Sequence, residues 1–294
     1  MRQMTLFKDN ECVHKAVVNV ASVPKRSPFR YPGGKTWLVP HVRQWLLSFE
    51  KRPLNFIEPF AGGAIIGLTV AFERLAEHVV LVELDDDVAS VWQAILGRNA
   101  KWLAETISKF EISGETVQHE LSRSPRSARQ RAFQTIIKNR VFHGGILAPG
   151  SGLIKHGENG KGIQSRWYPE TLERRILNIH LIRDRLTFQH GDGMNIISQY
   201  KDDANAAFFI DPPYSAGGKR AGVRLYKHFT LNHADLLKRV AALSGNFLMT
   251  YDDSEEIRAM AGHHKLEIRR IPMKTTHHTV TYELLIGRNF DWLH

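Results

Sequence analysis

An unbroken apolar run at residues 206–210 ends directly in Asp211-Pro212-Pro213-Tyr214. Such a run is typical of a strand in a parallel sheet that is covered on both faces. The prolines end the strand, because a proline has no N–H to donate to a sheet ladder. In open α/β sheets, ligands bind beyond the carboxyl ends of the strands. The sequence therefore predicts a stiff ligand-binding loop with a carboxylate at its start and an aromatic ring at its end.

This loop suits one kind of ligand, a planar base that carries an exocyclic amine. Asp211 and the backbone carbonyl of Pro212 can accept hydrogen bonds from the amine, and the ring of Tyr214 can stack on the base. The alternative is an ordinary strand-ending turn with a surface tyrosine.

Apolar runs and helical patterns alternate on both sides of a polar middle section, which predicts an α/β chain with a doubly wound sheet. We expect strands at 54–57, 78–84, 186–189, 206–210 and 247–250, and an antiparallel edge pair at 266–271 and 282–286. The chain divides into an N-terminal arm with the first part of the sheet domain (1–96), an insertion (97–185) and the second part of the sheet domain (186–294).

The charge is concentrated in the insertion. The whole chain has a net charge of +10, and residues 101–185 hold 15 Lys and Arg against 8 Asp and Glu. This excess favours a polyanionic partner, with a charged, solvated helix face as the alternative. The single cysteine, Cys12, excludes an internal disulfide and a Cys-based zinc site, and fits a reducing cytosol. No apolar stretch is long enough to span a membrane.

The first strand leads into a glycine-rich turn, residues 58–64, which lets the backbone approach a ligand closely. Glu83 ends the second strand about twenty residues later, where a carboxylate can hold two ribose hydroxyls. Asp192 ends the third strand and either accepts from an adenine amine or simply caps the next helix. Lys35 follows a Gly-Gly bend and can pair with a carboxylate or a phosphate. Together these features predict an adenosine-containing cofactor.

Four blocks, in this order and spacing, resemble the Dam-type (α-group) adenine-N6 DNA methyltransferases. They are Arg30–Lys35, Phe56–Ala64, Asp211–Tyr214 and Phe247–Asp253. Asn139–Gly145 also resembles the start of that family's target-recognition hairpin, and Glu283–Ile286 its last strand. The likeness covers about residues 28–290.

The resemblance implies a Rossmann-like methyltransferase sheet with an inserted, mainly helical plus hairpin target-recognition domain. It implies methyl transfer from S-adenosylmethionine to N6 of a flipped-out adenine in double-stranded DNA. The catalytic residues would be Asp211, Pro212 and Tyr214. The cofactor would lie against Tyr31, Lys35, Phe60, Ala61, Gly62, Glu83 and Asp192. No metal ligand cluster is expected.

We expect DNA contacts from the basic insertion. Arg126 and Arg129 would track phosphates from a helix. Asn139 would bind DNA at the start of a Gly-rich segment. Arg140, His143, Lys155 and His156 would read base edges from that segment, with a flexible connector as the alternative. The resemblance implies a cytoplasmic, nucleoid-associated enzyme of bacterial or phage origin. A cognate restriction endonuclease and the oligomeric state are left open.

Two other functions remain open at this point. One is cytosine-N4 methylation, because that amine has the same geometry, although such enzymes more often begin the motif with Ser. The other is a catalytically silent DNA-binding module on the same fold.

Overall fold

The computed structural model describes residues 20–31, 33–213, 231–274 and 280–293. Within them, seven strands form one mixed sheet in the order β3-β2-β1-β4-β5-β7-β6. The strands are β1 (Asn55–Glu58), β2 (His78–Glu83), β3 (Leu186–His190), β4 (Ala206–Ile210), β5 (Asn246–Asp252), β6 (Glu267–Lys274) and β7 (Val280–Gly287).

The sheet has a parallel part and an antiparallel edge. β3, β2, β1, β4 and β5 pair in parallel, whereas β7 runs antiparallel to both β5 and β6. The predicted α/β class, a doubly wound Rossmann-like sheet, is confirmed, and so is the antiparallel edge pair. The order reverses between β1 and β4, which is the switch point where such sheets bind ligands.

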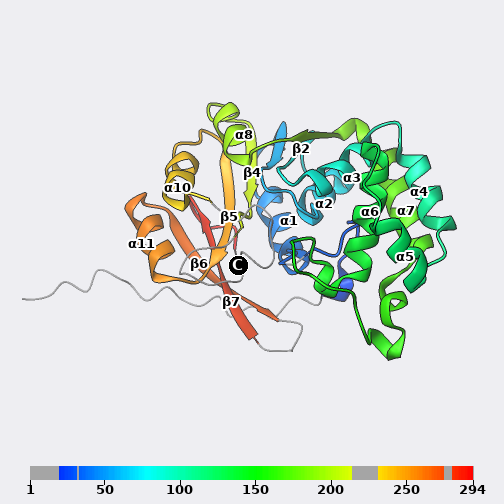
Figure 1. Cartoon of the computed structure of the whole chain (residues 1–294). Coiled ribbons are helices and arrows are strands. Elements are labelled where there is room, and N and C mark those ends of the chain that lie inside the picture. Colours follow the sequence, from blue (N-terminus) through cyan, green and yellow to red (C-terminus); the bar gives the residue numbers. More distant parts are fainter. Residues whose placement is uncertain (1–19, 32, 214–230, 275–279, 294) are drawn as a thin grey trace, which may run out of the picture.

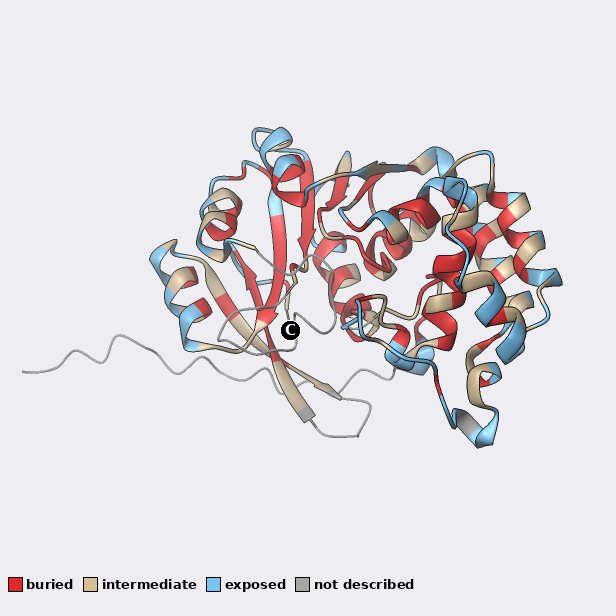
Figure 2. Ribbon diagram, viewed as in Figure 1, coloured by how far each residue is buried: buried red, intermediate tan, exposed pale blue. Residues whose placement is uncertain are grey.

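Helices cover both faces of the sheet (Figure 1). Successive strand residues point to opposite faces, so Phe56 packs in one hydrophobic cluster and Ile57 in the other. Both clusters are buried, which explains why the central strands are continuous apolar runs in the sequence (Figure 2). The helices are α1 (Val39–Leu47), α2 (Ile65–Glu73), α3 (Asp86–Leu96), α4 (Ala100–Lys109), α5 (Gly114–Leu121), α6 (Ala128–Val141), α7 (Pro169–Leu181), α8 (Gly193–Gln199), α10 (His233–Ala241) and α11 (Glu255–His263).

The insertion is helical and forms one end of the molecule (Figure 1). Its helices α4, α6 and α7 pack on α3, and Leu103, Ile136 and Ile176 belong to the same hydrophobic cluster as Phe56. Of the expected hairpin, the described residues give an isolated antiparallel bridge between Phe142 and Leu153. The boundaries at 97 and 185 stay a prediction.

Short 3-10 helices connect several of these elements: η1 (Val20–Ser22), η2 (Thr36–Leu38), η3 (His143–Gly145), η4 (Glu158–Gly160), η5 (Gly162–Arg166) and η6 (Arg183–Arg185). Among the described residues, no helix combines the length and the apolar composition that crossing a membrane requires.

Candidate functional site

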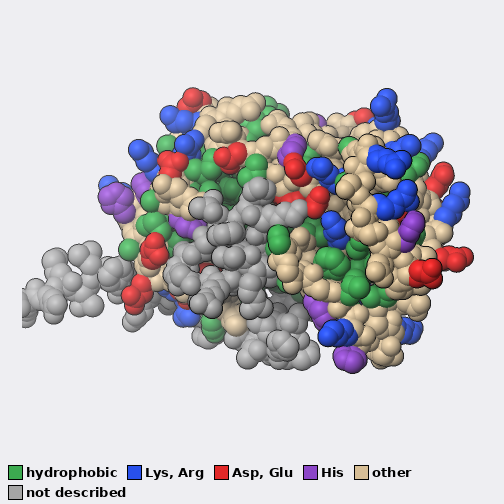
Figure 3. Space-filling view, viewed as in Figure 1, with side chains coloured by type: hydrophobic (Ala, Val, Ile, Leu, Met, Phe, Trp, Pro, Cys, Tyr) green, Lys and Arg blue, Asp and Glu red, His purple; other side chains and the backbone are tan. Residues whose placement is uncertain are grey.

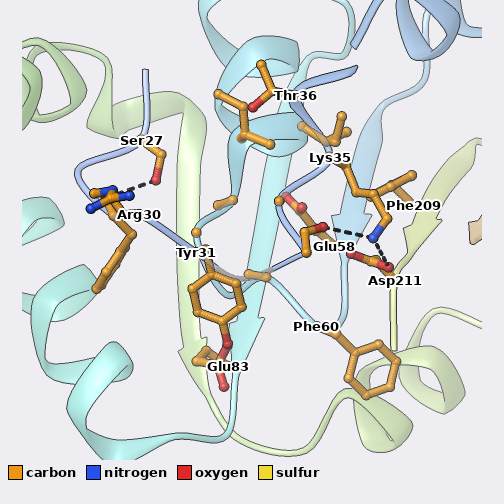
Figure 4. Close-up of a pocket in the computed structure, with 18 of the residues that line it drawn as sticks. Ser27, Arg30, Tyr31, Lys35, Thr36, Glu58, Phe60, Glu83, Phe209 and Asp211 are labelled. Atoms are coloured by element: carbon orange, nitrogen blue, oxygen red, sulfur yellow. Dashed lines mark hydrogen bonds and ion pairs between the residues drawn. The ribbon is translucent and has the colours of Figure 1, made fainter. Parts of the chain in front are cut away.

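A cavity of about 910 Å³ opens at the carboxyl ends of β1, β2, β3 and β4. It brings together residues that lie far apart in the sequence, as Figure 4 shows for Lys35, Glu83 and Asp211. The predicted catalytic and cofactor-binding residues that line it are Tyr31, Lys35, Phe60, Ala61, Glu83, Asp192 and Asp211. Gly62 lies in the turn between lining residues, Pro212 follows Asp211, and Tyr214 falls outside the described residues.

The turn after β1 has an unusual backbone. Gly62 has a φ of 46° and Ala64 a φ of 49°, both left-handed, and such a φ is uncommon for a residue with a side chain. The ring of Tyr31 lies directly on the turn, because a Cβ at position 62 would be 2.6 Å from Tyr31 Cε1. The indole Nε1 of Trp92 donates to the carbonyl of Gly62 at 2.9 Å and holds the turn from behind. Glycine is therefore required at 62 by conformation and by contact.

Glu83 organises this turn. Its Oε2 accepts from the backbone N–H of Gly62 at 2.8 Å, and its Oε1 accepts from Leu84 at 2.8 Å and Asp85 at 2.9 Å. Burial raises the pKa of Glu83, and the hydrogen bonds from Asp85, Gly62 and Leu84 oppose that shift. Figure 4 shows the Tyr31 hydroxyl pointing toward Glu83. The structure thus gives Glu83 a backbone role that the sequence did not indicate, and its ribose contact stays a prediction.

Asp192 lies at the next strand end. Its side chain accepts from the N–H of Met194 at 2.9 Å, so it does cap α8. It also lines the cavity, so the cap and the predicted ligand contact are compatible. A Cβ at Gly193 would be 2.3 Å from the Pro59 carbonyl, which shows how closely this loop approaches the one after β1.

A buried charge cluster lies at the end of β4. Lys35 is 3% exposed, and its Nζ lies 3.0 Å from Asp211 Oδ1 and 3.5 Å from Glu283 Oε2. The same Asp211 oxygen accepts from Thr250 Oγ1 at 2.6 Å. Two donors on one oxygen fix the orientation of the Asp211 carboxylate against the cavity. We call Lys35, Asp211, Thr250, Glu283 and Glu58 the acid end.

Two glutamates of the acid end are difficult to ionise. Burial raises the pKa of Glu283 to about 7, although Lys35 opposes the shift. Burial also raises the pKa of Glu58 well above its usual range. Glu58 accepts from the N–H of Gly67 at 2.8 Å, in the first turn of α2, where the N-cap residue offers no side-chain acceptor. A Cβ at Gly67 would be 2.5 Å from that Glu58 oxygen.

No site role was predicted for Glu58 or Thr250, and Glu283 was predicted only as part of the strand that resembles the family's last strand. Each lies in a strand beside the cavity: β1, β5 and β7, respectively. The available signal was a polar residue within a run that is otherwise apolar. Such a residue is buried only with a partner, and the sequence does not show the partner.

Two of the residues predicted to bind DNA, Asn139 and Arg140, are buried in this structure, and their DNA contacts stay predictions. Asn139 is fully buried: its amide donates to the carbonyls of Arg30 and Gly145, each at 2.9 Å, and accepts from the Arg30 N–H at 2.8 Å. Arg140 is 4% exposed, and its guanidinium donates to the Pro28 carbonyl. These residues tie the segment that carries Tyr31 and Lys35 to α6. A charge pattern alone cannot distinguish such a buried cation from a solvated one.

The other predicted DNA contacts are exposed. Arg126, His143 and Lys155 lie on the surface, and the exposed Arg129 lies over the ring of Trp102, with Cζ 4.7 Å from the ring centroid. Figure 3 shows Lys and Arg side chains spread over the helical end of the molecule. Their DNA contacts stay predictions.

The sequence matches no protein-family model and no curated protein. Among solved structures, the chain resembles the rRNA methyltransferase aviRa from Streptomyces viridochromogenes, with a TM-score of 0.43, 11% identity and coverage of 95% of this chain and 96% of that one. It also resembles a methyltransferase from Geobacter sulfurreducens, with a TM-score of 0.39, 13% identity and coverage of 89% and 81%. With TM-scores this low, the likenesses carry no argument about activity, and the fold assignment stands on the strand order.

Proposed function

We propose that this protein transfers a methyl group from S-adenosylmethionine to N6 of an adenine in double-stranded DNA. The observation that carries the proposal is the placement of Asp211. Lys35 and Thr250 orient its carboxylate at the end of β4, in the same cavity as Glu83 and Asp192. An amine acceptor thus shares one cavity with a nucleoside-type binding edge.

The chemistry of the donor set fits the cofactor. Glu83 and Asp192 offer carboxylate oxygens at neighbouring strand ends, and Gly62 and Gly63 add no side chains of their own to the turn. The two carboxylates can accept hydrogen bonds from ribose hydroxyls and an adenine amine, and the turn lets the cofactor approach the protein backbone closely. The ring of Tyr31 lies on this turn, so the cofactor would pack against it or displace it. When bound, the cofactor supplies an electrophilic methyl group on a sulfonium.

The target base would enter from the side of Asp211 and Pro212. Its amine is a weak nucleophile, because the nitrogen lone pair is delocalised into the ring. A carboxylate and a backbone carbonyl that accept from the two N–H groups favour a pyramidal nitrogen whose lone pair faces the methyl group. The amine nitrogen would accept that methyl group, with the sulfur leaving as a neutral thioether, and would then lose one proton. We assign Asp211 as the first acceptor of that proton.

Neighbouring residues prepare Asp211 for this role. Lys35 and Thr250 stabilise the charged carboxylate before the substrate arrives, so less reorganisation is needed during the reaction. Glu283, whose pKa is raised to about 7 by burial, lies across Lys35 and keeps the cluster close to neutral.

A tritium-transfer assay tests the proposal. Purified protein is incubated with S-adenosyl-[methyl-³H]methionine and unmethylated duplex DNA, and the nucleosides are separated after digestion. We expect label in N6-methyl-2′-deoxyadenosine. Label in N4-methylcytosine would favour the nearest enzyme alternative, and duplex binding without label would favour the silent module. Label only in parallel RNA substrates would reject DNA as the substrate.

Asp211→Ala is the matched test of mechanism. Removing one preorganised partner of the transition state costs about a hundredfold or more in rate, so methyl transfer should fall by at least that factor with the fold intact. Asp202→Ala, an exposed aspartate between α8 and β4, is the control and should keep full activity. Near-wild-type turnover in Asp211→Ala would contradict the mechanism.

A further inference from the structure

Four arginines converge on the same cavity as the acid end. Arg30, Arg140, Arg166 and Arg175 all line it, and we call them the arginine end. They come from the segment before η2, from α6, from η5 and from α7. In Figure 4, Arg30 lies on the opposite side of Tyr31 from Asp211, so the cavity carries positive charge at one end and carboxylates at the other.

Arg140 is the centre of this cluster. Burial lowers its pKa, and the positive charges of Arg175, Arg30 and Arg166 lower it further. One guanidinium nitrogen donates to the Pro28 carbonyl, whereas Nε is buried and has no hydrogen-bond partner among the described residues. Arg175 donates to the Ser27 carbonyl at 3.0 Å. Backbone carbonyls thus hold the side chains in place without neutralising them.

No carboxylate of the described residues balances the two inner arginines, Arg140 and Arg175. Within the part of the chain that the structure describes, neither Arg140 nor Arg175 forms an ion pair. A buried charge without a counter-ion is costly, and an unmatched buried N–H adds to that cost. A bound anion would remove both penalties, because guanidinium groups match oxyanions in charge and geometry.

We propose that the arginine end binds a backbone phosphate of the nucleic acid substrate. The proposal rests on the proposed function for the identity of that substrate. The side chain of Tyr168 favours a nucleic acid over a small acid as the ligand. Tyr168 lines the same cavity and is 52% exposed, and its hydroxyl donates a hydrogen bond to the Ser165 carbonyl at 3.0 Å. An exposed ring beside arginines provides a stacking surface for a base next to a site for its phosphate.

The two ends then have complementary tasks. The acid end accepts the amine of the target base, and the arginine end holds a phosphate of the same strand. Held at both points, the strand has a fixed direction and register in the cavity before the reaction.

The experiment measures duplex affinity by fluorescence anisotropy over a series of KCl concentrations, with S-adenosylhomocysteine present. Arg175→Gln is the test variant. Arg174→Gln is the matched control, because Arg174 is the neighbour on α7, is exposed and does not line the cavity. If Arg175 contacts a phosphate, affinity should fall roughly tenfold or more. The slope of log affinity against log salt should become shallower by about 0.9. Arg174→Gln should keep the wild-type slope.

Arg140→Met provides a second test variant, and its fold is checked by thermal unfolding. Equal slope changes in Arg174→Gln and Arg175→Gln would overturn the proposal in favour of a general surface field. Wild-type slopes in both Arg140→Met and Arg175→Gln would also overturn it. The carboxylate of the cofactor is another anion that the arginines could bind, and calorimetry with S-adenosylhomocysteine tests it. If Arg175→Gln lowers the affinity for this cofactor analogue and leaves the affinity for DNA unchanged, the arginines bind the cofactor carboxylate and the proposal is wrong.

Failure of this proposal and failure of the proposed function are distinguishable. If the wild type methylates DNA and all slopes are equal, only the phosphate site is rejected. If Arg175→Gln alone has a shallower slope but no adenine is methylated, the phosphate site stands and the proposed reaction is rejected.

Discussion

The two ends of the cavity handle buried charge in opposite ways. At the acid end, Lys35 lies between Asp211 and Glu283, so one cation serves two carboxylates. At the arginine end, Arg140 and Arg175 are held by the carbonyls of Pro28 and Ser27 and have no carboxylate partner among the described residues. The acid end thus contains its own counter-ion, whereas the arginine end is arranged for a partner from outside.

This difference indicates what each end contributes. A charged cluster that contains its own counter-ions depends on each member for its charge balance. Removing one member should therefore lower the free energy of unfolding. A cluster of like charges without counter-ions destabilises the folded state. Removing one member should therefore change the free energy of unfolding little, and it should weaken ligand binding instead. Substitutions at the two ends can therefore test the comparison directly.

The largest expected effect on stability is that of Lys35→Met. The substitution keeps much of the side-chain volume and leaves Asp211 and Glu283 without their shared cation. Removing one partner of a buried ion pair costs about 3–5 kcal/mol, and protonation of the carboxylates will reduce that cost at lower pH. Urea denaturation at neutral pH measures the free energy of unfolding, with the exposed Lys101→Met as control. Equal stability of the two variants would contradict the acid end as a folding element.

Glu83→Ala should have the next largest effect. It removes the acceptor of three backbone N–H groups and of the predicted ribose contact. Loss of a hydrogen bond to a charged group costs about 1.5–3 kcal/mol, so affinity for S-adenosylhomocysteine should fall roughly tenfold or more. Isothermal calorimetry measures it, with Glu77→Ala, whose side chain is 57% exposed, as control. Unchanged affinity would reject the ribose contact.

Glu283→Gln should change the pH dependence of stability. Burial raises the pKa of Glu283 to about 7 from an ordinary value of 4.5. Between these two pH values, Glu283 is protonated in the folded state and ionised in the unfolded state. The wild type therefore becomes less stable as the pH rises through this window.

The variant lacks this titration. Its stability relative to the wild type should rise across that pH window by about 3 kcal/mol and level off above it. Denaturation curves at several pH values measure the difference, with the exposed Glu105→Gln as control. If the stability difference between variant and wild type does not vary with pH, Glu283 does not titrate in this window and the prediction is wrong.

The smallest expected effect on stability is that of Arg140→Met. The variant loses the hydrogen bond to Pro28 but also removes a buried charge and its repulsion from three other arginines. We expect the free energy of unfolding to change by less than about 1 kcal/mol. The comparison with Lys35→Met, under the same urea conditions, is the measurement, and Arg174→Met is the surface control. A loss as large as that of Lys35→Met would remove the distinction between the two ends.

The strands were predictable because their signals are local. The run at 206–210 matches β4 in full, and the strands expected at 78–84 and 186–189 differ from β2 and β3 by one residue at one end. Apolar continuity reports burial on both faces, and prolines and glycines mark the strand ends. The antiparallel pair was predicted with shorter strands than β6 and β7, because residues that extend them, such as Pro272 and Thr281, do not follow an apolar pattern.

The site was only partly predictable. Lys35, Glu83, Asp192 and Asp211 follow strand ends or a glycine bend, and the fold brings strand ends together. Thr250 and Glu58 become site residues only through partners from other strands. Arg140 illustrates the limit: a basic run on a helix does not reveal which cation faces inward, since that depends on how α6 packs against residues 27–30.

The strand order also has a consequence for how the chain folds. β1 pairs on one side with β2, which follows one helix later, and on the other side with β4, which begins only at Ala206. Helices α3 to α7 can form local contacts first, whereas closing the long loop between β1 and β4 costs more chain entropy. Until β4 arrives, one edge of β1 remains open, with Phe56 and Ile57 uncovered on that side. We therefore expect the cavity to be assembled late in folding, and slow closure of β4 on β1 to be the step most exposed to aggregation.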